Sequence, residues 1–178
     1  DLGSGIAYTY SREERSIAAN DQINANIGFG AFHLTRPNQN FTNGTADRLY
    51  RKYVFHGNLV FGIPNTLMGI APSWLVQMQG LSKEITAGTM FKYYIKDDSK
   101  YTGFLKRSSV GVGAYYRTGD AVITSILLET GRFALGFSYD INTSKLVNAS
   151  NAKGGFEITF RMVTPAAFLY QRHAKTMF

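Results

Sequence analysis

Between residues 133 and 162, two segments alternate apolar and polar side chains with a period of two residues. Successive side chains of a β-strand point to opposite faces, so each segment predicts a strand with one apolar and one polar face. The apolar positions are mostly aromatic, whereas the polar positions of the second segment include a Glu and an Arg. This pattern is typical of a transmembrane β-barrel, whose outer face contacts lipid and whose lumen is polar. A soluble hairpin would alternate in the same way, and this stretch alone leaves both interpretations open.

The same alternation recurs along most of the chain and predicts about nine strands and no helix. The predicted strands cover residues 5–11, 23–31, 53–62, 68–79, 84–96, 110–117, 121–130, 133–140 and 155–162. Segment 121–130 is apolar on both faces, but its β-branched residues and short flanking turns favour a strand. Pro72 interrupts the fourth strand, where we expect a β-bulge. Strands of about ten residues match the span of a tilted strand that crosses a bilayer.

The composition favours a sheet that faces a membrane. Aromatic residues make up 14% of the chain and charged residues 17%, whereas soluble domains usually carry about a quarter charged residues. No apolar run approaches the roughly 20 residues that a membrane helix needs, so strands must make any membrane contact. The net charge of +7 is spread over the chain without a compact basic cluster, which argues against a nucleic-acid interface.

The sequence contains no motif that indicates catalysis, a metal site or a bound cofactor. Cysteine is absent, and His33, His56 and His173 lie too far apart for metal-ligand spacing. Asp97 and Asp98 are adjacent in a predicted turn without further spaced carboxylates, so we interpret them as solvated. Catalysis requires side chains that converge on one reacting atom, and no such set is evident. We therefore expect a protein that is not an enzyme.

Charged side chains on the polar faces are the remaining candidates for function. In a barrel these positions face the lumen, and we expect this placement for Lys92, Arg117, Asp140, Glu157 and Arg161. Ionisable groups at membrane depth are costly unless they are paired or hydrated. Glu157 and Arg161 share one face of one strand, and the simpler interpretation is a structural pair that braces the wall.

Five segments together carry a resemblance to a known family. They are HLTRPNQNF (33–41), KYVFHGNL (52–59), LMGIAPSWLVQMQG (67–80), GVGAYYRTGDAVI (111–123) and FALGFSYDINTSKLVNASNAKGGFEITF (133–160). With these segments the chain resembles the PorP/SprF family of Bacteroidetes outer-membrane proteins, which belong to the type IX secretion and gliding motility apparatus. Tyr115 stands where the family commonly has Trp, Gly155 replaces the usual Ala, and a tail follows the usual end of the family.

The resemblance implies a closed barrel in the cell outer membrane with an even number of strands, on the order of 14. Bacterial single-chain barrels close with an even number of strands, so a count of nine means either that strands are missing or that the count is wrong by one. We expect further strands N-terminal to Asp1. In this view residues 1–164 are an incomplete barrel and residues 165–178 a C-terminal tail. The resemblance also implies a non-enzymatic role in exporting or retaining surface proteins such as gliding adhesins. The implied partners are cargo with a C-terminal secretion signal, the large translocon barrel, periplasmic ring components and outer-membrane lipid.

The orientation of the strands predicts which loops meet these partners. With a periplasmic C-terminus, the connectors 33–51 and 141–154 are extracellular, together with the turns 80–83 and 118–120. The two longest loops then share one side, as is usual in outer-membrane barrels. We expect partner contacts from Arg36, Pro37, Asn38, Gln39, Phe41, Lys145, Asn148 and Ser150. A passive porin and a soluble β-sandwich binding protein are the alternatives.

Overall fold

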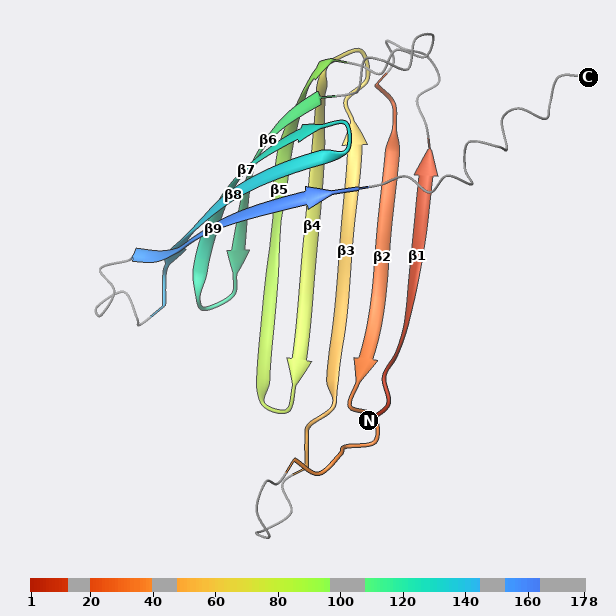
Figure 1. Cartoon of the computed structure of the whole chain (residues 1–178), viewed down its shortest axis with the longest axis vertical. Coiled ribbons are helices and arrows are strands. Elements are labelled where there is room, and N and C mark those ends of the chain that lie inside the picture. The colour runs from red at the N-terminus through yellow and green to blue at the C-terminus, as the bar shows by residue number, and fades with distance from the viewer. Residues whose placement is uncertain (13–19, 40–47, 97–107, 145–152, 164–178) are drawn as a thin grey trace, which may run out of the picture.

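The computed structural model of the chain forms one antiparallel β-sheet, and it describes residues 1–12, 20–39, 48–96, 108–144 and 153–163. Each strand pairs with the next one along the chain, so the sheet order follows the sequence (Figure 1). The strands are β1 (Ser4–Arg12), β2 (Ile23–Phe32), β3 (Lys52–Gly62), β4 (Met68–Gln79), β5 (Ser82–Lys96), β6 (Ser108–Arg117), β7 (Ala121–Thr130), β8 (Phe133–Asn142) and β9 (Lys153–Met162).

The all-β fold class and the count of nine strands are confirmed. Segment 121–130, which is apolar on both faces, is strand β7 as predicted. Within the described ranges, no helix is long and apolar enough to cross a membrane.

The pairing register places the alternating residues on two distinct faces. We call one the aromatic face; it carries Ile6, Tyr8, Phe29, Tyr53, Phe55, Trp74, Phe91, Val112, Tyr116, Ile126, Phe133, Phe137, Tyr139, Phe156, Ile158 and Phe160. Rings from adjacent strands contact one another on this face, as in Phe133–Phe160 with centroids 6.0 Å apart and Phe55–Trp74 at 6.2 Å. Cross-strand aromatic pairs of this kind stabilise a sheet by roughly 0.2–1 kcal/mol each.

The aromatic face is not packed into a core. Phe156, Ile158 and Phe160 are 62%, 62% and 66% exposed, and no large side chain in the described ranges is fully buried. A β-sandwich buries the inner faces of two packed sheets, whereas the described residues form a single sheet. The β-sandwich alternative is therefore wrong.

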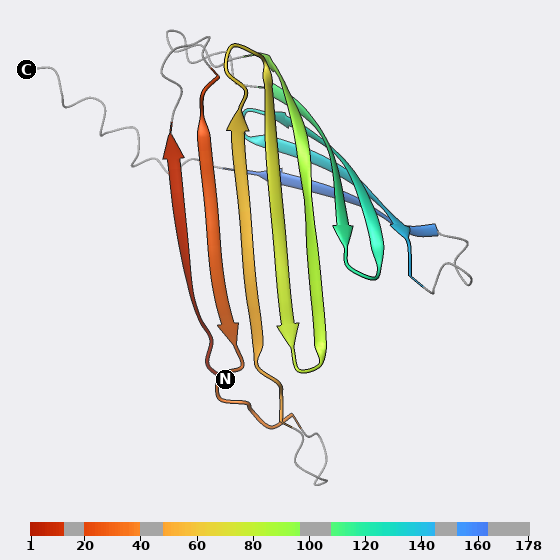
Figure 2. The ribbon, with the colours of Figure 1, turned by 180° about the vertical axis from the view of Figure 1, so that it is seen from behind.

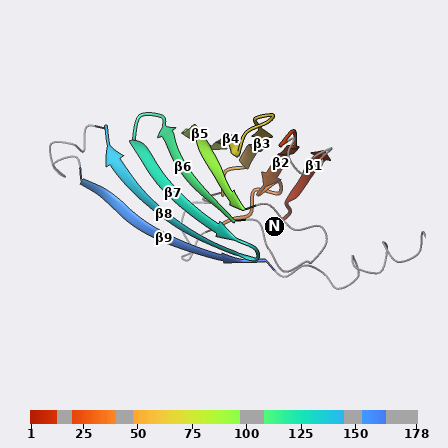
Figure 3. The ribbon, with the colours of Figure 1, turned by 90° about the horizontal axis from the view of Figure 1, so that it is seen from above.

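The opposite face, which we call the polar face, is the more covered of the two. The buried apolar residues Ala71, Met90, Tyr94, Ala121 and Ala134 all lie on it. Strands β1 to β5 run side by side, and β6 to β9 turn progressively away from them (Figure 2). Seen from above, the sheet is a curved wall with β1 and β9 at its two ends (Figure 3). β1 and β9 do not pair with each other, so this sheet is open.

The expected bulge at Pro72 is wrong. The β4–β5 register continues through Pro72↔Thr89 without a shift. On the β3 side, pairing holds at Asn58↔Ser73 and at Phe61↔Ile70 in the same register and is interrupted between them. Proline has no N–H to donate, and the sheet accommodates this by a local gap in the ladder rather than by an extra residue. Register shifts occur instead near the ends of β5 and β8.

Antiparallel order groups the strand ends at two rims of the wall. The connectors 33–51, 80–81, 118–120 and 143–152 join strand ends at what we call the loop rim, and the others join them at the opposite rim. Connector 97–107 at the opposite rim is longer than 143–152. The expectation that the two longest loops share one side is therefore wrong, because β8 and β9 extend further than their alternation indicated.

Candidate functional site

The polar face carries two clusters of charged side chains, one at each rim. All five charged residues predicted for the lumen lie on this face: Lys92, Arg117, Asp140, Glu157 and Arg161. Four of them belong to the two clusters. Whether this face encloses a lumen stays a prediction.

The first group, the Glu129 cluster, lies at the opposite rim and comprises Lys92, Ser109, Glu129 and Arg161. Glu129 Oε2 accepts hydrogen bonds from Lys92 Nζ at 2.7 Å and from Ser109 Oγ at 2.9 Å. Its other oxygen, Oε1, accepts one from Arg161 Nη2 at 3.0 Å. One carboxylate on β7 therefore accepts hydrogen bonds from two cations and a hydroxyl, which come from three other strands, β5, β6 and β9.

Small residues on the intervening strands make these contacts feasible. Ser109, Glu129, Ala134 and Arg161 are consecutive partners in register across β6 to β9. Ala134 is 5% exposed and lies between Glu129 and Arg161. A long side chain at this position would stand between the two charged groups, since cross-strand neighbours on one face are only about 4.5–5.5 Å apart.

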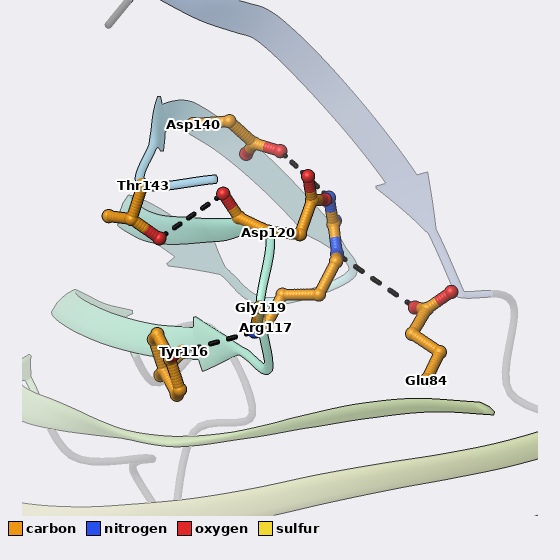
Figure 4. A network of polar contacts seen from close by, with 7 residues as sticks. All are labelled: Glu84, Tyr116, Arg117, Gly119, Asp120, Asp140 and Thr143. Carbon is orange, nitrogen blue, oxygen red and sulfur yellow. Dashed lines mark hydrogen bonds and ion pairs between the residues drawn. The ribbon is translucent and has the colours of Figure 1, made fainter. Parts of the chain in front are cut away.

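The second group, the Arg117 cluster, lies at the loop rim and comprises Glu84, Arg117, Asp120 and Asp140 (Figure 4). Arg117 Nη1 donates to Asp120 Oδ2 at 3.1 Å and to Asp140 Oδ2 at 3.2 Å. Glu84 Oε1 lies 3.8 Å from Arg117 Nε, close enough for an ion pair but too far for a hydrogen bond. Here one cation faces three carboxylates, whereas in the Glu129 cluster one carboxylate faces two cations.

The 118–120 turn holds the Arg117 cluster in place. Gly119 has φ of 71°, a left-handed conformation that glycine adopts without strain. The carbonyl of Asp120 accepts hydrogen bonds from the Thr143 amide at 2.8 Å and from Thr143 Oγ1 at 3.2 Å (Figure 4). These bonds tie the turn to the end of β8. Ala121, the cross-strand partner of Arg117 on β7, is completely buried, and its small side chain lets Arg117 reach across β7 to Asp140.

The predicted partner-binding residues lie at the loop rim where the structure describes them. Arg36 places its guanidinium carbon 5.9 Å from the centroid of the Tyr50 ring. The Pro37 carbonyl accepts the Leu49 amide at 2.9 Å, and Asn38 forms a β-bridge with Arg48. Gln39 is exposed. The other four, Phe41, Lys145, Asn148 and Ser150, lie outside the described residues.

The interpretation of Glu157 and Arg161 as a structural pair is wrong. Arg161 pairs with Glu129, and Glu157 makes no ion pair within the described ranges. Residues four apart along a strand are about 13 Å apart, so their side chains do not meet. Sequence reasoning also missed Glu129, Glu84 and Asp120. Alternate residues of β7 face the polar side, and Glu129 is the last of them. This alternation was the sequence feature that could have placed Glu129 on the polar face.

The chemistry of this face is ion pairing and hydrogen bonding. Among the described residues, no group of three His, Asp or Glu side chains is arranged to hold a metal ion. The side chains are spread along the wall in two clusters rather than converging on one point.

Comparison with known proteins identifies the family. Residues 1–162, which include every described strand, match the family model described as type IX secretion system membrane protein PorP/SprF. Searches of curated proteins and of solved structures gave no match. The expected resemblance is confirmed over nearly the whole chain, and the protein therefore belongs to the PorP/SprF family of type IX secretion system membrane proteins.

Proposed function

We propose that this chain forms part of a closed outer-membrane β-barrel that serves type IX secretion without being an enzyme, by binding secreted surface proteins and docking to the translocon. The observation that carries the proposal is the difference between the two faces of a single sheet. The aromatic face is exposed along β9, at 62% for Phe156 and 66% for Phe160. In water such a face would associate with other apolar surfaces, whereas lipid covers it in a membrane.

In the proposed barrel, strands beyond the nine described close the wall. β1 and β9 each present a strand edge whose backbone groups need partners, because an unpaired group in hydrocarbon costs several kcal/mol. In this proposal, further strands pair with both edges and complete an even-numbered barrel, of which residues 1–164 form one part and residues 165–178 a tail. The polar face then becomes the lumen wall, and Lys92, Arg117, Asp140, Glu157 and Arg161 line it.

The loop rim is the proposed contact surface for cargo and translocon. Arg36, Asn38 and Gln39 are exposed there, and the Asn38–Arg48 bridge and the Pro37–Leu49 hydrogen bond hold the base of the 33–51 connector. A surface loop on a rigid scaffold is a common place for binding residues. Cargo with a C-terminal signal domain would meet this rim if it faces outward, and periplasmic ring components would meet the opposite rim.

The test compares two deletions of equal length in the full-length protein. One removes Asn38–Asp47 from the loop rim, and its matched control removes Asp97–Lys106 from the opposite rim. We expect the first deletion to abolish surface display of cargo and the second to retain it, with both proteins still migrating as folded barrels on heat-modifiability gels. Retained display after the first deletion would contradict the role of the loop rim. If that deletion blocks assembly, the double substitution Arg36→Ala and Asn38→Ala replaces it.

A passive porin is the second candidate, and the charged residues of the polar face favour it. Single-channel conductance of the purified, closed barrel distinguishes the two functions. Steady ion conductance together with normal cargo display after the Asn38–Asp47 deletion would favour the porin. Loss of display in that variant, with unchanged conductance, would favour the secretion role.

A further inference from the structure

A pocket of about 290 Å³ opens on the polar face beside the Glu129 cluster. Its walls come from parts of the chain far apart in sequence. Gln22 contributes from just before β2, Asn24 from the start of β2, Lys92 from β5, Arg132 from the turn between β7 and β8, and Arg161 from β9. The pocket therefore exists only because the curved sheet brings β2 and β9 to the same hollow.

The charges around this pocket do not balance. Three cationic side chains line it, Lys92, Arg132 and Arg161, against a single carboxylate, Glu129. Glu129 is shared between Lys92 and Arg161. The Arg132 side chain is exposed and makes no hydrogen bond or ion pair with the part of the chain that the structure describes.

The donors that remain suit an oxyanion. A guanidinium presents five N–H donors in a planar fork that matches a carboxylate or a phosphate. Arg161 uses its Nη2 on Glu129, so most of its donors remain, and the Arg132 donors are unused within the described ranges. Lys92 adds positive charge close by, which strengthens the attraction for an anion in a partly enclosed site.

From this geometry we infer that the pocket is a binding site for a small oxyanion, a carboxylate or phosphate group held between Arg132 and Arg161. The volume limits the ligand. A water molecule occupies about 30 Å³ in the liquid, and ligand pockets start near roughly 300 Å³. The site therefore holds a small anion or the acidic tip of a longer molecule, not a folded domain. The inference does not depend on cargo binding at the loop rim.

Calorimetric titration of the purified full-length protein in detergent tests the site. Inorganic phosphate and succinate are the two probes, each at constant ionic strength with chloride as the balancing anion, because nonspecific charge effects are screened alike at equal ionic strength. We expect saturable binding of at least one probe. Saturation by phosphate alone assigns a phosphate ligand, and saturation by succinate alone assigns a carboxylate ligand. Absence of saturation by either probe would overturn the proposal.

Two variants and a matched control locate the binding. Arg132→Gln and Arg161→Gln should each weaken binding about tenfold or more, since a charge-assisted hydrogen bond is lost in each. Arg132→Lys should recover only part of the affinity, because it keeps the charge but not the fork. Lys83→Gln removes an exposed cation at the loop rim and should bind as the wild type does. Equal affinities of Arg132→Gln and Lys83→Gln would refute the assignment, and circular dichroism verifies that each variant retains the sheet.

Discussion

Replacement of Glu129 by Gln is the sharpest test of how the polar face is stabilised. Glu129 is the only carboxylate in its cluster, and it accepts hydrogen bonds from Lys92, Ser109 and Arg161. The substitution keeps the size of the side chain but removes its charge. Lys92, whose side chain is only 15% exposed, then has no carboxylate partner in this cluster.

The two ion pairs of Glu129 should contribute unequally. Removing one partner of a buried pair costs roughly 3–5 kcal/mol, whereas an exposed pair is worth about 0–1 kcal/mol. The Lys92 and Glu129 side chains are 15% and 24% exposed, nearer the buried limit, while Arg161 is 62% exposed. We therefore expect Glu129→Gln to lower the free energy of unfolding by about 2–3 kcal/mol. Arg161→Gln should lower it by about 0–1 kcal/mol.

The assay is equilibrium urea unfolding of the full-length protein in lipid vesicles, followed by the circular-dichroism signal of the sheet. Glu157→Gln is the matched control, because it removes a carboxylate from the same face that makes no ion pair within the described ranges. It should change the free energy of unfolding by less than about 0.5 kcal/mol. Equal effects of the Glu129 and Glu157 substitutions would refute the reasoning, since they would show that shared pairing at Glu129 contributes nothing.

Three further substitutions test other contacts, two of them by the same unfolding assay and Gly57→Ala by fluorescence of the folded state. Ala121→Leu should destabilise the protein by about 1–3 kcal/mol, because Ala121, opposite Arg117 in the ladder, is fully buried and a larger side chain overpacks the site; an unchanged midpoint would contradict this packing. Gly57→Ala should shift the Trp74 emission in the folded state, since a β-carbon at 57 would overlap the indole ring, and unchanged spectra would show that the ring lies elsewhere. Asn20→Asp should cost at least about 1–3 kcal/mol, because the Asn20 amide donates to three carbonyls of the 63–68 segment and a carboxylate cannot. Wild-type stability of the Asn20→Asp variant would exclude those hydrogen bonds.

The fold could be predicted in most respects because the two-residue period is a local property. It specifies which residues share a face, and strand β8 shows this directly: Phe133, Phe137 and Tyr139 lie on the aromatic face and Asp140 on the polar one. The family resemblance added what the two-residue period cannot, the secretion system.

The charged clusters could be predicted only in part. Alternation placed Lys92, Arg117 and Arg161 on the correct face, but their partners depend on the curvature of the sheet and on small residues between strands. Glu129 was missed because β7 is apolar on both faces elsewhere and its one acidic residue stands at the strand end. Pro72 shows the opposite failure, since a local rule predicted a bulge where the surrounding ladder keeps its register.

The Glu129–Arg161 and Arg117–Asp140 pairs each join strands that are separated by a third strand. In a flat sheet such strands lie about 9.5 Å apart, yet the charged atoms approach to 3.0 and 3.2 Å. Flattening the sheet would separate the charged groups of both pairs. Sliding of one strand along its neighbour is already opposed by the backbone hydrogen bonds between them. The two pairs therefore act as cross-ties that oppose flattening of the wall at its two rims. Between them, Gly111, Gly113 and Gly136 place no side chain on the polar face.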